Sequence, residues 1–273
     1  MNRLFAKLSP AILMLGLLPL LMAANKRTDF SDAEIVDYAA GNKSGTVEVK
    51  LIPKDATRAT VVLKNHSKKP LRIKLPSVFV GVPVLAQGDG FGPPGGFDNR
   101  GNQGQQAGSQ AIGGGIAGGQ GFPGGGRGGQ GLFNVAPDGV RKIVVTTVCL
   151  EHGKKDPNPR IAYSLRPIES FTKDEQVHSL CRRLGQGRID QKSAQALSWH
   201  LNGLTWQQLA SKVKTRHVNG TNEMFFGARN LRVAKQTLTS IEKRVAEQAE
   251  STSLASREET RTIEISHPLA TVQ

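Results

Sequence analysis

The stretch VRKIVVTTVCLEHGKKDP, residues 140–157, decides how the rest of the chain is interpreted. Its first half is rich in β-branched residues and predicts a strongly apolar strand, which Cys149 terminates. Its second half contains Gly153 and Asp156-Pro157, which are typical of a turn. Upstream of this stretch the chain has the pattern of strands, and downstream it soon has the pattern of helices. We therefore expect an α+β protein whose candidate chemical centre is Cys149.

The β region is divided by a glycine-rich segment. Alternating apolar residues predict strands in a first block, residues 25–87, which also begins with a short helix started by a capping box at Ser31. A second block, residues 132–171, contains the strand described above. Glycine fills close to half of residues 88–131 between the blocks, a composition that predicts a disordered insert. The two blocks are expected to form one antiparallel β-sandwich.

The last hundred residues have the periodicity of helices. Residues 172–250 predict a helical bundle, because their apolar positions recur at helical spacing. The helix start signals in this region are the capping boxes Thr172/Glu175 and Thr205/Gln208 and the capping residue Asp190. Residues 251–273 are polar and predict a tail, in which Thr262 to Ile265 could add a short edge strand.

The first 24 residues have the form of a secretory signal. Arg3 and Lys7 supply a positive charge, residues 11–21 are apolar, and Ala23-Ala24 offers a cleavage site. The apolar run is short for a membrane span. We expect export to the periplasm, the cell surface or the extracellular space, with no membrane-spanning segment after the signal is removed. An uncleaved N-terminal anchor is the alternative.

The charge of the chain favours anionic partners. It carries 36 Lys and Arg against 22 Asp and Glu, a net charge of +14, with a pI near 10.1. For an exported protein the corresponding partners are polyanionic envelope polymers or surface proteins, although a generally basic, solvated surface explains the charge as well. Aromatic residues make up only 5% of the chain and do not alternate with basic runs, which argues against nucleic-acid binding.

The two cysteines allow several states. Two cysteines in an exported chain usually pair, so we predict a Cys149–Cys181 disulfide. A zinc site is the second interpretation, and zinc is then the only cofactor expected. Its ligands would be Cys149, His152, His178 and Cys181, the side-chain types that zinc prefers. Inert buried thiols and a Cys149–His152 nucleophile pair are further alternatives.

Two motifs carry a resemblance to known proteins. VCLEHGKKDP at 148–157 and AQALSWHLNGLTWQQLA at 194–210 resemble stretches of exported bacterial proteins of unassigned function that contain a glycine-rich insert. More distantly, the order of parts resembles the thioester (TQXA) domains of bacterial surface adhesins. Those domains combine a β-sandwich with a helical bundle, and a strand cysteine is bonded to the glutamine of a Thr-Gln-x-Ala-x-Trp helix.

This second resemblance implies a thioester between Cys149 and Gln195. Gln195 lies four residues before Trp199, as in the motif. Ala194 replaces the threonine of the motif and Leu197 replaces its alanine. A thioester excludes the disulfide, because both would use the sulfur of Cys149.

The sequence contains no catalytic set that we would assign to an enzyme. Glu151 and Asp156 are close carboxylates, but no second feature marks them as an acid/base pair. Gln195, on an apolar helix, is expected to satisfy a backbone group. The function expected is that of a secreted, non-enzymatic envelope or extracellular protein whose basic surface binds polyanionic or protein partners. The alternatives are a thioester-like covalent attachment domain and, after it, a zinc-binding module.

Overall fold

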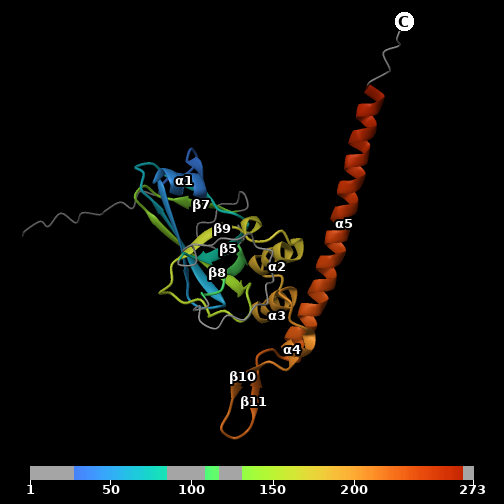
Figure 1. Ribbon diagram of the computed structural model, residues 1–273. Helices are drawn as coiled ribbons and strands as arrows, with labels where there is room; N and C mark the ends of the chain where they lie inside the picture. Colours follow the sequence, from blue (N-terminus) through green and yellow to red (C-terminus); the bar gives the residue numbers. More distant parts are fainter. Residues whose placement is uncertain (1–27, 85–107, 117–130, 267–273) are drawn as a thin grey trace, which may run out of the picture.

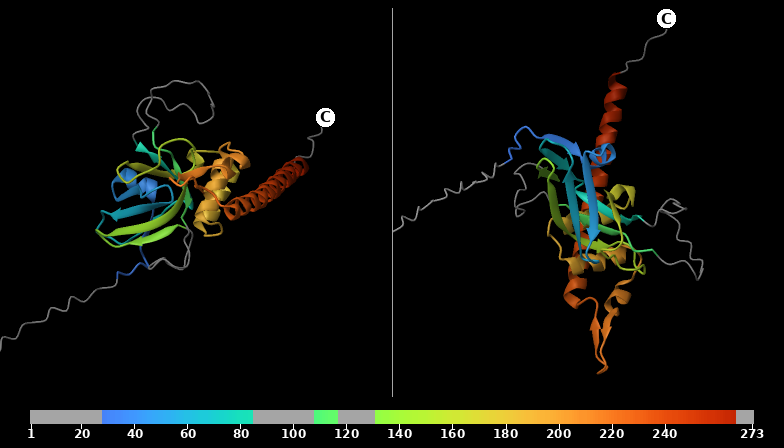
Figure 2. Two further views of the ribbon diagram at one scale, coloured as in Figure 1. Left: turned by 90° about the horizontal axis from the view of Figure 1, so that it is seen from below. Right: turned by 90° about the vertical axis from the view of Figure 1, so that its left-hand side faces the viewer.

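The computed structural model describes residues 28–84, 108–116 and 131–266. The described chain combines a closed β-barrel, two small sheets and a group of helices on one side of the barrel (Figures 1 and 2). The predicted α+β class is confirmed. The sandwich and the helical bundle are not confirmed, because six strands close into a barrel and the helices pack against it. The predicted signal peptide lies outside the described residues.

The strands are β1 (Glu34–Asp37), β2 (Val47–Pro53), β3 (Arg58–Asn65), β4 (Leu71–Lys74), β5 (Val78–Pro83), β6 (Ile112–Gly115), β7 (Leu132–Val135), β8 (Val140–Cys149), β9 (Tyr163–Pro167), β10 (Val213–Arg216) and β11 (Asn222–Met224). The helices are α1 (Tyr38–Ser44), α2 (Glu175–Gly185), α3 (Gln191–Leu201), α4 (Trp206–Ala210) and α5 (Ala228–Ser266), with a 3-10 turn at Ile168–Ser170.

The barrel has the strand order β2-β3-β8-β6-β5-β9 and closes where Leu51 of β2 pairs with Tyr163 of β9. Its interior is filled by alternate residues of each strand, as the period of two requires. Closure leaves the sheet without the free edges that a sandwich would have. The large side chains of this core include Leu51, Leu63, Phe79, Ile112 and Ile143, and Phe133 of β7 packs in the same core.

The strand β6 lies inside the segment that the sequence predicts to be disordered. It pairs with β5 on one side and β8 on the other and so completes the barrel between them, while the two predicted β blocks also pair directly, for example through β3 and β8. Its three glycines are packed closely: a Cβ on Gly113 would lie 2.8 Å from Cys181 Sγ, and one on Gly115 would lie 2.6 Å from the backbone oxygen of Cys181. The glycine run is therefore what lets α2 approach the barrel. The rest of the predicted insert lies outside the described residues, apart from Gly108–Ala111, Ile116 and Gly131.

A three-stranded sheet, β1-β4-β7, lies beside the barrel. The helix predicted to start at Ser31 is wrong in its position, because residues 34–37 form β1 and pair in parallel with β4. The helix α1 follows, with Asp37 as its cap: the Asp37 carboxylate accepts from Ala39 N at 2.9 Å. The residues around Ser31 have the types that cap a helix, but residues 34–37 pair with β4, so the helix begins only after Asp37.

The helices α2, α3 and α5 share a second hydrophobic core with the outer side of the barrel. The capping predictions at Asp190 and at Thr205/Gln208 are confirmed. The capping box predicted at Thr172 is wrong: Asp174 caps α2, and Thr172 Oγ1 accepts from Asp174 N at 3.1 Å instead.

The last part of the chain also differs from the prediction. Residues 213–224 form the hairpin β10–β11, and α5 continues through the predicted tail to Ser266, including the residues predicted as an edge strand. Figures 1 and 2 show α5 extending well beyond the rest of the molecule. None of the described helices, α5 included, is apolar enough over a sufficient length to cross a membrane.

Candidate functional site

The loop after Cys149 is a junction between three parts of the barrel. Leu150 N donates to Ala111 O at 2.9 Å, and Gln110 N donates to Lys155 O at 3.0 Å. The loop thus encloses the segment that leads into β6. The hydroxyl of Tyr163, on β9, completes the arrangement by donating to Gln110 O at 2.8 Å. The stretch singled out from the sequence is therefore central to the fold.

The two carboxylates of this loop are engaged in the same junction. Glu151 accepts from Ala111 N at 2.8 Å and from the ammonium of Lys154. Asp156 accepts from the side-chain amide of Gln110 at 2.7 Å. Glu151 and Asp156 thus connect the loop to the segment that leads into β6.

A polar face of α3 lies along the end of β8. Gln195 Oε1 accepts from Cys149 N at 2.8 Å, and its Nε2 donates to Cys149 O at 2.9 Å. Ser198 Oγ also donates to Cys149 O, and Asn202 Nδ2 donates to Leu150 O. These residues recur at helical spacing, so α3 satisfies backbone groups that no neighbouring strand reaches. The expectation that Gln195 bonds a backbone group is confirmed.

The thiol of Cys149 is buried in the barrel core, whereas Gln195 contacts only the backbone of this residue among the hydrogen bonds described. Burial, and then the charges of Asp156, Asp55 and Glu151, raises the pKa of the thiol. A protonated, enclosed thiol is a poor nucleophile and a poor metal ligand.

Cys181 belongs to the second core, between α2 and the outside of the barrel. Burial raises the pKa of its thiol to about 12. Both cysteines are free in the structure, and they lie in cores separated by the barrel wall, because Cys149 faces inward from β8 and its neighbour Val148 faces the core of Cys181. The structure does not bring the two thiols together in a bond, and the disulfide stays a prediction.

The four predicted zinc ligands are dispersed. A ring nitrogen of His178 lies 2.8 Å from Thr172 O, and its other ring nitrogen lies 3.4 Å from Glu175. His152 lies beside α3 and the hairpin, away from the barrel interior that holds Cys149. Within residues 28–84, 108–116 and 131–266, no three His, Cys, Asp or Glu side chains gather in a way that could hold a metal ion.

His152 belongs instead to an aromatic cluster at the base of the hairpin. Its ring meets the ring of Trp199 edge-on at 4.9 Å, and Phe225 lies 5.1 Å from Trp199. Lys212 Nζ lies 2.9 Å from His152 Nε2 and 5.2 Å from the Trp199 ring. Burial, and then the charge of Lys212, lowers the pKa of His152. A neutral imidazole accepting from the ammonium fits this direction.

The open surface of the barrel carries a basic face that sequence reasoning missed. It is formed by the outward side chains of β2, β3 and the first half of β8: Glu48, Lys50, Ile52, Arg58, Thr60, Val62, Lys64, Val140, Lys142, Val144 and Thr146. The lysines and the arginine of this face were visible in the sequence as outward positions of alternating strands, but only the pairing register shows that these residues adjoin.

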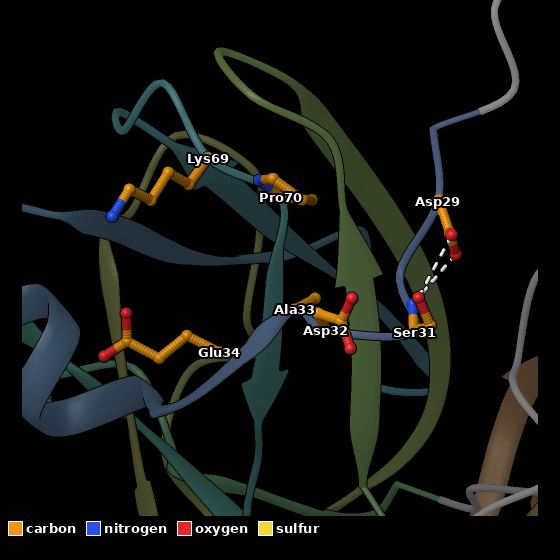
Figure 3. Close-up of a pocket in the computed structure, with 7 residues that line it drawn as sticks. All are labelled: Asp29, Ser31, Asp32, Ala33, Glu34, Lys69 and Pro70. Carbon is orange, nitrogen blue, oxygen red and sulfur yellow. Dashed lines mark hydrogen bonds between the residues drawn. The ribbon is translucent and has the colours of Figure 1, made fainter.

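A hollow of about 470 Å³ lies beside β1 and is lined by Asp29, Ser31, Asp32, Ala33, Glu34, Lys69 and Pro70 (Figure 3). It is wide open to solvent. The carboxylate of Asp29 already accepts hydrogen bonds from the backbone N and the hydroxyl of Ser31. The carboxylates of Asp32 and Glu34 point in different directions in Figure 3, so they do not converge on a ligand.

Comparisons of the chain with family models, with curated proteins and with solved structures give no significant match.

Proposed function

We propose that this protein is an exported, non-enzymatic envelope or extracellular protein that binds polyanionic polymers through the basic face. The observation that carries the proposal is the strand register. Lys50 of β2 and Lys142 of β8 both lie opposite Val62 of β3, one on each side. Lys64 lies two residues after Val62 on the same face of β3. Lys64 is thus a diagonal neighbour of both other lysines, with side chains about 7–8 Å apart.

The positive charge of the basic face is only weakly compensated. Glu48 is the one carboxylate among its residues, and it pairs with Lys50 and lies 3.5 Å from His66. No described ion pair joins Arg58, Lys64 or Lys142 to a carboxylate. Glu48 nevertheless lies directly opposite Lys64 in the pairing of β2 with β3, and after the hydrogen bond from Lys50 the charge of Lys64 is one of the causes that lower the pKa of Glu48. Arg58 and Lys142 are therefore available to an anion, and the charge of Lys64 is partly compensated by Glu48.

The shape of the basic face suits an extended partner. Arg58 and Lys64 lie at opposite ends of β3, about 20 Å apart at the usual rise per residue of a strand. A barrel strand holds its side chains in fixed positions, so the charges need little ordering when a polymer binds. A linear polymer with a charge on each repeating unit could contact several of them at once.

The test is salt-dependent retention of the full chain on immobilised heparin, on polygalacturonate and on isolated envelopes. We expect retention at about 0.1 M salt and release towards 1 M, because the screening length falls from about 10 Å to about 3 Å. The triple variant Arg58→Gln, Lys64→Gln, Lys142→Gln should elute at clearly lower salt.

The matched control is Lys68→Gln, Lys214→Gln, Lys243→Gln. It removes the same charge from lysines that are already paired with carboxylates elsewhere on the molecule. Equal elution of the two triple variants, or no salt-sensitive retention of the unchanged protein on any of the three matrices, would contradict the proposal.

Covalent attachment through a Cys149–Gln195 thioester is a second candidate, favoured by the contact between the Gln195 carboxamide and Cys149. Both polar atoms of the carboxamide bond the backbone, so the side chains would have to rearrange before the sulfur displaced ammonia. The intact mass of the denatured chain distinguishes the states. Loss of one ammonia means a thioester, loss of two hydrogens means the disulfide, and an unchanged mass removes both.

A further inference from the structure

A second concentration of positive charge lies where α2 ends against the middle of α5, outside the basic face. Arg183 is in the last turn of α2, and Arg188 follows the turn after it. The backbone N of Arg188 donates to Arg183 O at 2.9 Å, which keeps both residues at the same end of the helix. Figure 1 shows α2 beside α5, in agreement with the core that they share.

The third arginine comes from α5. The guanidinium of Arg183 reaches across the contact between α2 and α5, called here the seam, and donates to Ser240 Oγ at 2.9 Å. Arg244 is four residues after Ser240, so it lies on the same face of α5, one turn further along. After burial, the charges of Arg244 and Arg188 are the largest causes that lower the pKa of Arg183. Arg183, Arg188 and Arg244 therefore form one cluster, called here the arginine cluster.

The arginine cluster has no counter-ion among the described residues. No ion pair joins any of its members to a carboxylate in this part of the chain, and the nearby Glu247 pairs with Lys243. The C-terminal end of α2 contributes the equivalent of about half a negative charge, which offsets only part of three positive charges. The placement of α2 against α5 thus brings three like charges near one another, with Arg183 half-buried and Arg188 and Arg244 exposed.

We propose that the arginine cluster is a binding site for an oxyanion, namely a phosphate or sulfate group. The planar guanidinium forms two parallel hydrogen bonds to such a group, and three guanidinium groups can surround its tetrahedral oxygens. Arg183 is held in place by Ser240, so one donor is already positioned. The proposal does not depend on the basic face, which lies on other elements and presents mainly lysines.

The test is thermal unfolding of the full chain with inorganic phosphate, and separately with sulfate, at an ionic strength held constant with chloride. A ligand that binds the folded state raises the Tm as its concentration rises. Arg183→Gln and Arg244→Gln should each weaken the apparent affinity by about tenfold or more. In low salt without the anion, Arg244→Gln should raise the Tm, because it relieves repulsion.

That second readout separates a ligand site from arginines that only stabilise the seam, since a purely structural Arg244 would give a lower Tm when replaced. The matched control is Arg182→Gln, in the same turn of α2, whose charge is not among those acting on Arg183. An unchanged phosphate response in Arg183→Gln and Arg244→Gln, or an equal loss in Arg182→Gln, would overturn the proposal.

The same variants identify the source of the group. Heparin binding that survives the triple substitution of the basic face and is lost in Arg183→Gln supports a group carried by a polymer. A phosphate response that is lost in Arg183→Gln, with no change in heparin binding, supports a free ion.

Discussion

Gln195 makes the most informative contact of any single side chain in this protein. Its carboxamide pairs with both backbone groups of Cys149, in the way that a neighbouring strand would. The strand β3 follows β8 only as far as Arg58 and Thr57, so the last residues of β8 need another partner. A glutamine on a buried helix supplies both a donor and an acceptor at this position.

Replacing Gln195 by Leu should therefore destabilise the protein by about 1–3 kcal/mol, because Cys149 N is left buried without a partner. Cys149 O keeps the hydroxyl of Ser198. Urea unfolding followed by far-UV circular dichroism measures the loss. Gln191→Leu is the control, because Gln191 makes one partly buried bond, to Thr147 O at 3.1 Å. An equal loss in both variants would refute this account of Gln195.

At the scale of elements, β6 decides the architecture. It supplies the pairing that connects β5 to β8, and α2 packs directly on its outer side. Glycine is unfavourable in most strands because it has no side chain to pack. Here the missing side chains allow a helix and a strand to approach closely, and a hypothetical Cβ on Gly185 would meet Gly115 Cα at 2.4 Å.

Gly115→Ala should destabilise the protein by about 1–3 kcal/mol or more, since the added methyl group must push α2 away from the barrel. Gly108→Ala provides the control within the same segment, because an added Cβ there meets nothing within 4 Å. The two midpoints of chemical unfolding are compared with that of the unchanged protein. If Gly115→Ala is as stable as Gly108→Ala, the close packing of α2 on β6 does not require glycine at position 115.

At the scale of the whole molecule, three parts meet at His152: the loop from the barrel, the helix α3 through Trp199, and the base of the hairpin through Lys212. The pKa of His152 is lowered in the folded protein, so the folded state binds fewer protons than the unfolded state as the pH falls. The contribution of this contact is present above the unfolded pKa of about 6.5 and is lost as the pH falls through the folded-state pKa.

Between pH 7.5 and 5, the unchanged protein should therefore lose more stability than His152→Gln, which cannot become charged. Chemical unfolding at a series of pH values measures the difference between the two proteins. Hydrogen exchange of residues 212–225 shows whether the hairpin opens first. Parallel pH profiles for the two proteins would show that His152 does not couple the pH to this junction.

The sequence by itself determined the α+β class, the strands with alternating apolar residues, and the caps at Asp190 and Thr205. These depend on contacts within a few residues, which a local pattern records. It also pointed to residues 140–157 and to a backbone partner for Gln195. The net charge of +14 indicated a basic surface but not its position.

Only the tertiary structure decided that the sheet closes, that part of the glycine-rich segment is a strand, and that the two cysteines lie in different cores. Each depends on residues far apart in the chain. A glycine run has the same composition whether it is a linker or the surface on which a helix packs. The basic face and the arginine cluster could not be predicted from the sequence for the same reason. Strand register and helix packing, rather than proximity in sequence, bring their charges together.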